Sequence, residues 1–394
     1  MLDLAKRKIV VKFGGSSLRG ADEMLQCASI LRDYERRGSS IVCVCSAIGD
    51  TTDLLLEAFA LASLKDFKSA RAILKVIRKR HVDVIKEIII GSELEIQGFI
   101  ERKIDGVIQE LAPLKNFDIR TQDSIISIGE QLSTLIFSKL LALQGLKTLY
   151  LNGGDAGITT DETFGFAKPL LELTEAKLQR NLLPLMSEGI TPVVTGYIAK
   201  TTKGEITTLG RGGSDYSATL IASAISADEL YLFTDVDGIL SADPQIVRNA
   251  RTVKQLSYLE ASEASFFGAK SMPSQSLNPV ARKRIPVWIK NTFNPLAKGT
   301  LITHEESKKE VKCVGSISTG YGLATVGLVG NNIGNQIRIE AIEALALDEI
   351  DVLEDDYSGS KLTFVIKEKD RQKALKTLHS RFFSSSEISE LIAN

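Results

Sequence analysis

Short apolar runs alternate with stretches of helical spacing along most of the chain. Residues 9–13 form an apolar run that ends in glycines, residues 21–37 have apolar positions at helical spacing, and residues 41–45 form a second apolar run. Strand, glycine turn, helix and strand in this order are typical of parallel βαβ units. Further strands are expected at residues 148–151, 191–195, 229–233 and 286–289. We therefore predict an α/β fold, a three-layer helix-sheet-helix domain with a mostly parallel central sheet and its ligand at the carboxyl ends of the strands.

The pattern changes near residues 294–300, and a polar run covers residues 304–310. We place a domain boundary there, which gives a catalytic domain over 1–300 and a small α+β domain over 305–394. The expected elements of the small domain are strands at 311–317 and 323–329, a helix at 332–347, strands at 350–357 and 361–366, and a helix at 369–383. The first of these strands is expected to complete a four-stranded sheet.

Composition narrows the possible functions. Hydrophobic residues make up 44% and charged residues 25%, as in folded globular proteins. The 48 Lys and Arg residues balance 49 Asp and Glu residues, so no overall positive field attracts nucleic acid or a membrane surface. A basic stripe on the mostly helical segment 52–112 is interpreted as a solvated helix face for the same reason.

The few cysteines and histidines bear on the compartment and on metal binding. Four cysteines form no paired framework, and the chain has neither a signal-peptide pattern nor about 18 uninterrupted apolar residues. We expect a cytoplasmic protein without a membrane partner. The three histidines lie far apart in the sequence, so no protein-held metal site is predicted.

The motif K-F-G-G-S-S at residues 12–17 follows the first predicted strand. Glycines after a buried strand allow backbone N–H groups to approach phosphate oxygens, and Lys12 can place its charge beside a transferring phosphoryl group. A Gly-Gly turn after a strand is also common without any ligand. No G-x-x-x-x-G-K-[ST] loop is present, which excludes the P-loop ATPase design.

The motif T-L-G-R-G-G-S-D at residues 208–215 precedes another predicted helix. Such a loop can present N–H donors to an anion, and Arg211 can bind a carboxylate through two parallel hydrogen bonds. The alternative is a tight turn with Ser214 and Asp215 as a helix-capping pair, but that interpretation leaves Arg211 unexplained.

Three weaker candidates complete the set. The T-D-V-D-G run at 234–238 puts acidic side chains at a strand end, where they could meet a nucleotide or form an ordinary Asp-Gly turn. Lys270 could contact phosphates, and Glu130 lies at a helix start. Taken alone, each of these two residues is more typical of a protein surface.

Taken in order, these segments resemble aspartate kinases of the amino-acid kinase superfamily. The matching segments are V-K-F-G-G-S-S (11–17), S-I-G-E (127–130), T-T-L-G-R-G-G-S-D-Y (207–216), F-T-D-V-D-G-I (233–239) and F-G-A-K (267–270). The resemblance implies ATP- and Mg²⁺-dependent phosphorylation of the L-aspartate side chain to 4-phospho-L-aspartate. That reaction is the first step toward diaminopimelate, lysine, threonine and methionine.

By the same resemblance, Lys12 would stabilise the transferring phosphoryl group and Asp215 would organise the reacting groups. Arg211 would hold the substrate α-carboxylate and Glu130 its ammonium group. The implied supporting substrate contacts are Thr52 and Ser214, and the implied nucleotide contacts are Gly14, Gly15, Ser16, Ser46, Thr234, Asp235 and Lys270.

The sequence departs from the family pattern at two places. On the nucleotide side, Leu240 stands where an aromatic residue is frequent, Gln245 stands where an arginine is common, and Pro273 lies where a His-Pro pair is usual. At the C-terminus only one of two usual ACT modules is recognisable, because residues 318–322 leave no room for the inserted one. We therefore expect weak or absent inhibition by lysine, although an amino-acid effector and a homodimer formed through the ACT-like domain remain expectations.

Two other kinds of function compete with this one. Another kinase of the superfamily could act on glutamate, acetylglutamate or UMP, whereas Arg211 with Glu130 favours a free amino acid. A non-catalytic amino-acid sensor with an inactive kinase domain is the alternative from outside the enzymes. Retention of Lys12, Arg211, Asp215 and Lys270 together argues against it.

Overall fold

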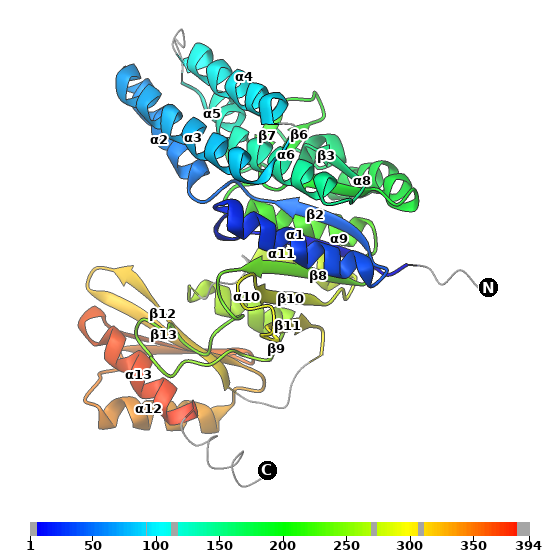
Figure 1. Ribbon diagram of the computed structural model, residues 1–394. Helices are drawn as coiled ribbons and strands as arrows, with labels where there is room; N and C mark the ends of the chain where they lie inside the picture. Colours follow the sequence, from blue (N-terminus) through cyan, green and yellow to red (C-terminus); the bar gives the residue numbers. More distant parts are fainter. Residues whose placement is uncertain (1–5, 92, 112–116, 269–273, 306–310, 384–394) are drawn as a thin grey trace, which may run out of the picture. The chain divides into compact units, whose positions relative to one another are not determined.

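A computed structural model describes residues 6–91, 93–111, 117–268, 274–305 and 311–383 (Figure 1). By packing, the chain divides into two compact units, unit 1 (Met1–Asp235) and unit 2 (Val236–Asn394). The predicted domain boundary at residues 300–305 rests on a change in the sequence pattern, whereas the division into units rests on packing. The boundary stays a prediction.

Unit 1 is built around a parallel sheet. Its strands are β1 (Lys8–Phe13), β2 (Ser40–Cys45), β3 (Thr148–Leu151), β5 (Thr191–Thr195) and β8 (Glu229–Thr234), in the order β3-β5-β2-β1-β8. Every neighbouring pair in this order is parallel. β1 and β2 are almost entirely buried. Strands that are covered on both faces need nearly continuous apolar runs, which explains the apolar sequence of these two. The predicted parallel sheet is confirmed.

Helices cover both faces of that sheet. The helices α1 (Ala21–Arg36) and α6 (Ile128–Leu143) contact each other and the sheet, and α8 (Leu171–Ser187) and α9 (Gly213–Ala224) form a second contacting pair (Figure 1). The apolar segment Ile119–Leu143 is long enough to cross a membrane, but 83% of its apolar window is buried inside the protein. It is therefore a core segment of the three-layer domain.

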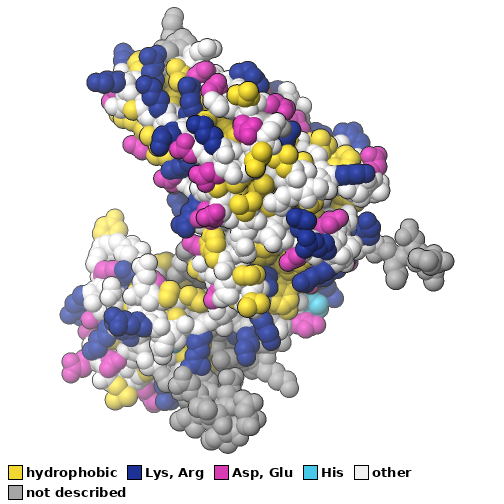
Figure 2. Space-filling view, in the orientation of Figure 1, with side chains coloured by type: hydrophobic (Ala, Val, Ile, Leu, Met, Phe, Trp, Pro, Cys, Tyr) yellow, Lys and Arg dark blue, Asp and Glu magenta, His cyan; other side chains and the backbone are white. Residues whose placement is uncertain are grey.

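The mostly helical segment of unit 1 forms α2 (Thr51–Ser63), α3 (Phe67–Ile88), α4 (Glu93–Leu111) and α5 (Ile119–Ile126). The basic side chains on α3 are exposed, as predicted; they are Lys68, Arg71, Lys75, Lys79 and Lys86. Figure 2 shows Lys and Arg side chains interleaved with Asp and Glu in the upper part of the view, over these helices. The stripe is a solvated face.

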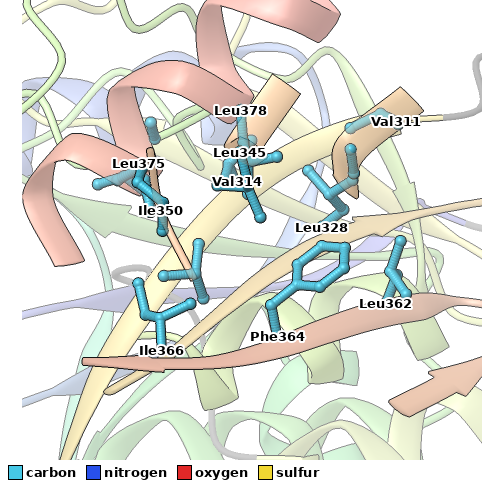
Figure 3. Close-up of a cluster of buried hydrophobic side chains, with 14 of the residues drawn as sticks. Val311, Val314, Leu328, Leu345, Ile350, Leu362, Phe364, Ile366, Leu375 and Leu378 are labelled. Carbon is cyan, nitrogen blue, oxygen red and sulfur yellow. The ribbon is translucent and has the colours of Figure 1, made fainter. Parts of the chain in front are cut away.

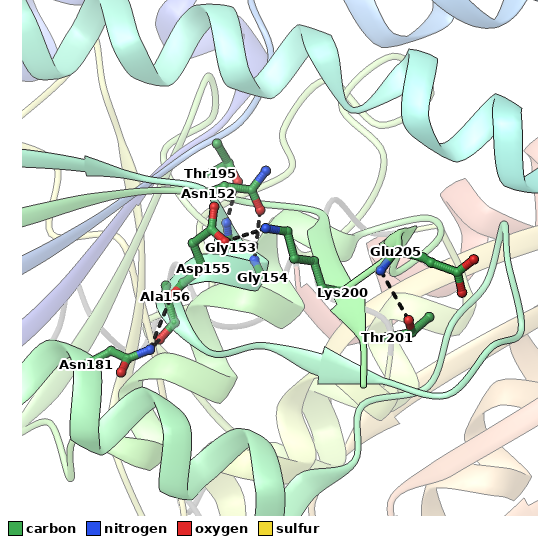
Figure 4. A network of polar contacts seen from close by, with 10 residues as sticks. All are labelled: Asn152, Gly153, Gly154, Asp155, Ala156, Asn181, Thr195, Lys200, Thr201 and Glu205. Atoms are coloured by element: carbon green, nitrogen blue, oxygen red, sulfur yellow. Dashed lines mark hydrogen bonds and ion pairs between the residues drawn. The ribbon is translucent and has the colours of Figure 1, made fainter. Parts of the chain in front are cut away.

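A small three-stranded sheet in unit 1 was not predicted. It consists of β4 (Thr159–Thr160), β6 (Ile198–Thr201) and β7 (Ile206–Thr208). Lys200 of β6 pairs with Asp155 in the segment 153–156, and the Gly153 N–H of the same segment donates to Thr195 at the end of β5 at 2.8 Å (Figure 4). β7 leads directly into the loop that carries Arg211.

Unit 2 begins with three strands and two helices. The strands are β9 (Gln255–Ser257), β10 (Val287–Asn291) and β11 (Thr300–Thr303), where β10 pairs antiparallel and β9 parallel with β11. The helices are α10 (Tyr258–Phe266) and α11 (Ser274–Arg282). Ser257 and Glu260 form a reciprocal capping box that fixes the start of α10.

The predicted C-terminal module is present in unit 2 as an antiparallel sheet with two helices. Its elements are β12 (Val311–Gly320), β13 (Leu323–Gly330), α12 (Asn335–Leu347), β14 (Glu354–Ser358), β15 (Lys361–Lys367) and α13 (Arg371–Phe383). The strand order β12-β13-β15-β14 confirms that residues 311–317 supply the fourth strand. Alternate side chains such as Leu362, Phe364 and Ile366 fill its core (Figure 3). We call residues 311–383 the ACT-like module.

The ACT-like module is joined to α10 by close contacts within unit 2. Phe267 lies against β12 and β13, where a Cβ on Gly315 or Gly327 would come within 2.2 or 2.1 Å of its side chain. The buried ammonium of Lys312 pairs with Glu260 at 3.3 Å. The segment 242–250 also packs into the core of the module. These contacts hold α10 and the ACT-like sheet in one packed body.

Candidate active site

A cleft of about 570 Å³ opens in unit 1 at the carboxyl ends of β1, β2 and β5. This is the sheet edge where a ligand was predicted. Eight of the predicted site residues line it: Lys12, Gly15, Ser46, Thr52, Glu130, Arg211, Ser214 and Asp215. Segments more than two hundred residues apart in the sequence therefore meet in one cavity.

Lys12 and Asp215 form an ion pair in the cleft. The ammonium and carboxylate lie 2.6 Å apart, and the two side chains are 12% and 24% exposed, so a ligand can reach both. The alternative interpretation, in which Ser214 and Asp215 cap the helix, does not hold in the structure. The cap position of α9 is Gly212, in a left-handed conformation with φ 74°, and Asp215 lies in the first helical turn. Its carboxylate is therefore available to Lys12 rather than used on the backbone.

The glycine turn after β1 forms a short 3₁₀ helix, η1 (Gly15–Leu18), against the loop after β2. A Cβ on Gly15 would lie 2.8 Å from the Gly49 carbonyl oxygen, and the Gly49 N–H donates to the Gly15 carbonyl at 3.0 Å. Only glycine fits here without displacing backbone. The two loops form a narrow backbone wall beside Lys12, which suits phosphate oxygens.

Glu130 is buried and lines the cleft, so the alternative of an ordinary surface residue does not hold. The residue is 4% exposed, and the Thr52 hydroxyl donates to its Oε1 at 3.4 Å. Among the described residues, nothing pairs with its Oε2. Burial raises the pKa of the Glu130 carboxyl to about 8, against hydrogen bonds that lower it. A buried carboxyl with a free oxygen facing a cavity is suited to a cationic group.

Arg211 is exposed between two left-handed glycines, Gly210 with φ 73° and Gly212 with φ 74°. Phe166 packs against Gly210, where a Cβ would lie 2.2 Å from the ring. In the part of the chain that the structure describes, nothing pairs with the Arg211 guanidinium. The glycine pair turns the backbone so that this cation faces the cleft.

Four of the predicted nucleotide contacts that the structure describes, Gly14, Ser16, Thr234 and Asp235, do not line the cleft. Gly14 lies next to it and donates its N–H to the Phe233 carbonyl at 3.2 Å, and Ser16 lies in η1. Thr234 donates to Asp235 at 3.1 Å at the end of β8. Lys270 and Pro273 lie outside the described residues. Their roles stay predictions.

The sequence analysis missed several residues that line the cleft, among them Gln122, Ile126, Phe166 and Tyr197. Gln122 and Ile126 are four positions apart on α5, a helix that the apolar pattern did not separate from its neighbours. Tyr197 has a left-handed φ of 66°, although no glycine marks that position. No motif in the sequence identifies these residues.

Unit 2 contains a second cavity, of about 430 Å³. Leu240 and Gln245, two of the three departures on the nucleotide side, both line it, and so does Phe267. Arg371 and Leu375, from the last helix of the ACT-like module, complete its wall. The Arg371 Nε donates to Glu368 at 2.8 Å.

Comparison with known proteins places the chain in a family. The model of the amino acid kinase family matches residues 7–291. Aspartokinase 1, chloroplastic, of Arabidopsis thaliana is 37% identical over 298 residues, which are 75% of this chain and 52% of that protein. Lysine-sensitive aspartokinase 3 of Escherichia coli is 33% identical over 303 residues, 75% of this chain and 64% of that protein. The chain thus spans between about half and two thirds of these relatives.

A solved structure agrees with the fold. E. coli aspartokinase III in complex with aspartate and ADP matches 95% of this chain and 99% of its own, with a TM-score of 0.83 and 24% sequence identity. The parallel sheet with helices on both faces, the cleft at its strand ends and the family match over residues 7–291 lead to one conclusion: the chain belongs to the amino acid kinase family.

Proposed function

We propose that the chain is an aspartate kinase, which transfers the γ-phosphoryl group of ATP to the side-chain carboxylate of L-aspartate and releases ADP. One observation carries the proposal. A single cleft contains the Lys12–Asp215 ion pair, the Arg211 guanidinium and the buried Glu130 carboxyl. This set provides a cation for the reacting phosphoryl group and one group of each sign for a zwitterionic substrate.

The amino-acid substrate is held at both α-groups in this proposal. Arg211 binds the α-carboxylate through a bidentate pair, and Glu130 accepts the ammonium on its unpartnered Oε2. Thr52, which already contacts Glu130, and Ser214 support the same end. The side-chain carboxylate is ionised near neutral pH, so the reaction needs no strong base.

Lys12 and Asp215 act at the phosphoryl group. The main obstacle to the reaction is the repulsion between two anions, and a positioned cation reduces it most strongly in the transition state. Asp215 fixes the Lys12 ammonium at 2.6 Å and so sets its location before the substrates arrive.

The residues present fit ATP and Mg²⁺. A Cβ on Gly14 would lie 3.6 Å from the Lys12 ammonium, so this glycine leaves room beside the cation for a phosphate group. The described residues contain no cluster of three metal-ligating side chains. This agrees with Mg²⁺, which keeps several waters and is held mainly through nucleotide phosphates. When bound with ATP, it would neutralise phosphate charge.

We propose that the cavity in unit 2, taken by itself, accommodates a purine nucleoside. Its wall combines apolar side chains such as Leu240 and Phe267 with the polar Gln245. An apolar cavity with a few polar groups suits a purine ring and its ribose. Lys270, Thr234 and Asp235 are proposed as phosphate and ribose contacts on the basis of the motif resemblance alone.

The proposal extends to partners. The edge strands of the ACT-like sheet, β12 and β14, suit pairing between two copies in a homodimer. An amino-acid effector is a further expectation, since a relative is described as lysine-sensitive. A cytoplasmic location likewise stays a prediction.

An ATP-dependent hydroxamate assay tests the function directly. Hydroxylamine traps an acyl phosphate, so L-aspartate with ATP and Mg²⁺ should give the hydroxamate. Little or no product is expected with glutamate, acetylglutamate or UMP. The reaction with UMP is measured by the release of ADP, because it forms no acyl phosphate. Product with acetylglutamate but not with aspartate would contradict the roles of Glu130 and Arg211. No product with any acceptor would favour the non-catalytic sensor.

A further inference from the structure

Asp123 is a fully buried carboxylate just outside the cleft. It lies on α5 between Gln122 and Ile126, which line the cleft, and it accepts three hydrogen bonds. Its Oδ1 accepts from the Thr208 hydroxyl at 2.7 Å, and its Oδ2 accepts from the N–H groups of Thr208 at 3.1 Å and Gly165 at 2.8 Å. All three partners are donors, which is the arrangement that an ionised carboxylate requires.

The two segments that Asp123 binds both reach the amino-acid end of the cleft. Thr208 ends β7 and is followed by Gly210 and Arg211, and Gly165 precedes Phe166. The segments also contact each other, because the Ala167 N–H donates to the Thr208 carbonyl at 2.9 Å and the Phe166 ring packs on Gly210. Asp123 therefore anchors a junction at the cleft wall, because Gly165 lines the cleft and Thr208 lies two residues before Gly210, which also lines it.

Tyr197 supports the same junction from the opposite side. Its carbonyl accepts from the Leu209 N–H at 3.0 Å, and its ring packs against Gly213. The left-handed backbone at Tyr197 is strained for a side chain of this size. Strain of this kind persists only where surrounding contacts hold it, so the Arg211 loop is fixed on two sides.

We propose that Asp123 is a positioning residue for the amino-acid substrate: by accepting hydrogen bonds from Thr208 and Gly165, it fixes the Arg211 loop and the Phe166 loop in register. The proposal deepens the proposed function and rests on it in assigning Arg211 to the substrate α-carboxylate. Asp123 does not touch the substrate. Its effect reaches the substrate through Arg211 and Phe166.

The test compares two substitutions at this position. Asp123→Leu keeps the approximate size but leaves two buried N–H groups without an acceptor. Asp123→Asn can accept both N–H groups on its amide oxygen and donate to the Thr208 hydroxyl. We expect Asp123→Leu to raise the KM for aspartate on the order of 10- to 100-fold, with the KM for ATP unchanged within about twofold. Asp123→Asn should remain within about threefold of the unsubstituted protein.

Asp118→Leu is the matched control, because Asp118 caps the same helix α5 by accepting from the Thr121 N–H at 2.7 Å and does not line the cleft. It should lower the Tm without changing either KM. If Asp123→Leu does not fold, Thr208→Val removes only the hydroxyl donor and should raise the same KM by a smaller factor. An equal rise in both KM values, or an Asp123→Asn variant as impaired as Asp123→Leu, would overturn the positioning role.

Amide hydrogen exchange separates this proposal from the proposed function. In Asp123→Leu the amides of Gly165 and Thr208 should exchange faster, whichever substrate the protein uses, while those of α9 keep their protection. Unchanged exchange at both amides overturns the role of Asp123 even if aspartate is phosphorylated. Faster exchange in a protein that fails to phosphorylate aspartate leaves the junction supported and removes the proposed substrate.

Discussion

The cleft in unit 1 and the cavity in unit 2 are similar in volume but are lined by different kinds of side chain. Charged side chains and glycine turns at strand ends form the cleft, where Lys12, Asp215, Glu130 and Arg211 meet. The cavity in unit 2 has walls of apolar side chains and contains few charges, among them Asp243 and Arg371. The first is suited to handle anions, and the second is suited to accommodate a ring.

This difference explains where sequence motifs carry information. Charges in the cleft need fixed backbone positions, so glycines and charged residues recur there in recognisable runs. The walls of the cavity in unit 2 need only size and polarity, which many residues satisfy. Leu240 and Gln245 can therefore depart from the family pattern while the cavity itself is retained. Each of the following experiments perturbs one side of this comparison.

The largest effect is expected from Lys12→Ala. Loss of the cation at the phosphoryl group should lower turnover by about three orders of magnitude or more, with a small change in the KM for aspartate. The measurement is the initial rate in the hydroxamate assay. Lys8→Ala on the same strand is the control, since Lys8 donates to the Ile225 carbonyl away from the cleft. Equal losses in both variants would show that β1 is merely destabilised.

Glu130→Gln should separate binding from stability. Glutamine cannot ionise, whereas the Glu130 carboxyl can lose its proton when the substrate ammonium binds beside it, so the KM for aspartate should rise on the order of 100-fold. Because burial raises the pKa of Glu130 from 4.5 to about 8, its neutral form favours the folded state. This stabilisation is fully present below pH 4.5, the pKa of the carboxyl in the unfolded chain. It is lost as the pH rises through about 8, the pKa in the folded protein.

Glutamine has no such titration, so Glu130→Gln should be the more stable protein at about pH 9 and should lose less stability between neutral and alkaline pH. Thermal unfolding across this range provides the measurement. A variant less stable than the unsubstituted protein at alkaline pH would contradict the assignment of a buried neutral acid.

Arg371→Gln addresses the cavity in unit 2. Arg371 lines that cavity, so its loss should weaken the binding of adenosine, measured by equilibrium titration, by roughly three- to tenfold and leave the KM for aspartate unchanged. Arg381→Gln is a close control on the same helix, because each arginine pairs with a glutamate, Glu368 or Glu340. If the two variants behave alike, the cavity does not bind the nucleoside.

The smallest effect is expected from free lysine or threonine. β12 passes into β13 through a tight turn at Tyr321, with Gly320 paired to Leu323, so the described hairpin has no inserted module. Millimolar lysine or threonine should therefore leave the initial rate nearly unchanged. Strong cooperative inhibition would show that an effector site exists elsewhere in the chain.

The parallel sheet, the ACT-like module and eight cleft residues were predictable because local pattern determines them. Buried strands such as β1 need continuous apolar runs, and phosphate-facing turns need glycine. Burial of Glu130 and the anchoring by Asp123 were not predictable, since both depend on partners far away in sequence. Thr208 lies 85 residues beyond Asp123, and no local pattern indicates that pairing. The short strands β4, β6 and β7 escaped prediction because tertiary contacts rather than propensity define them.

The contact between Phe267 and the two glycines of the ACT-like sheet limits how this protein can be re-engineered. The ring occupies the space that side chains on Gly315 and Gly327 would need. A sheet grafted from another regulatory protein would therefore need glycines at both positions. Without them it could not pack against Phe267 at the end of α10. Two modules with the same fold are therefore not interchangeable unless both lack a Cβ at the positions of Gly315 and Gly327.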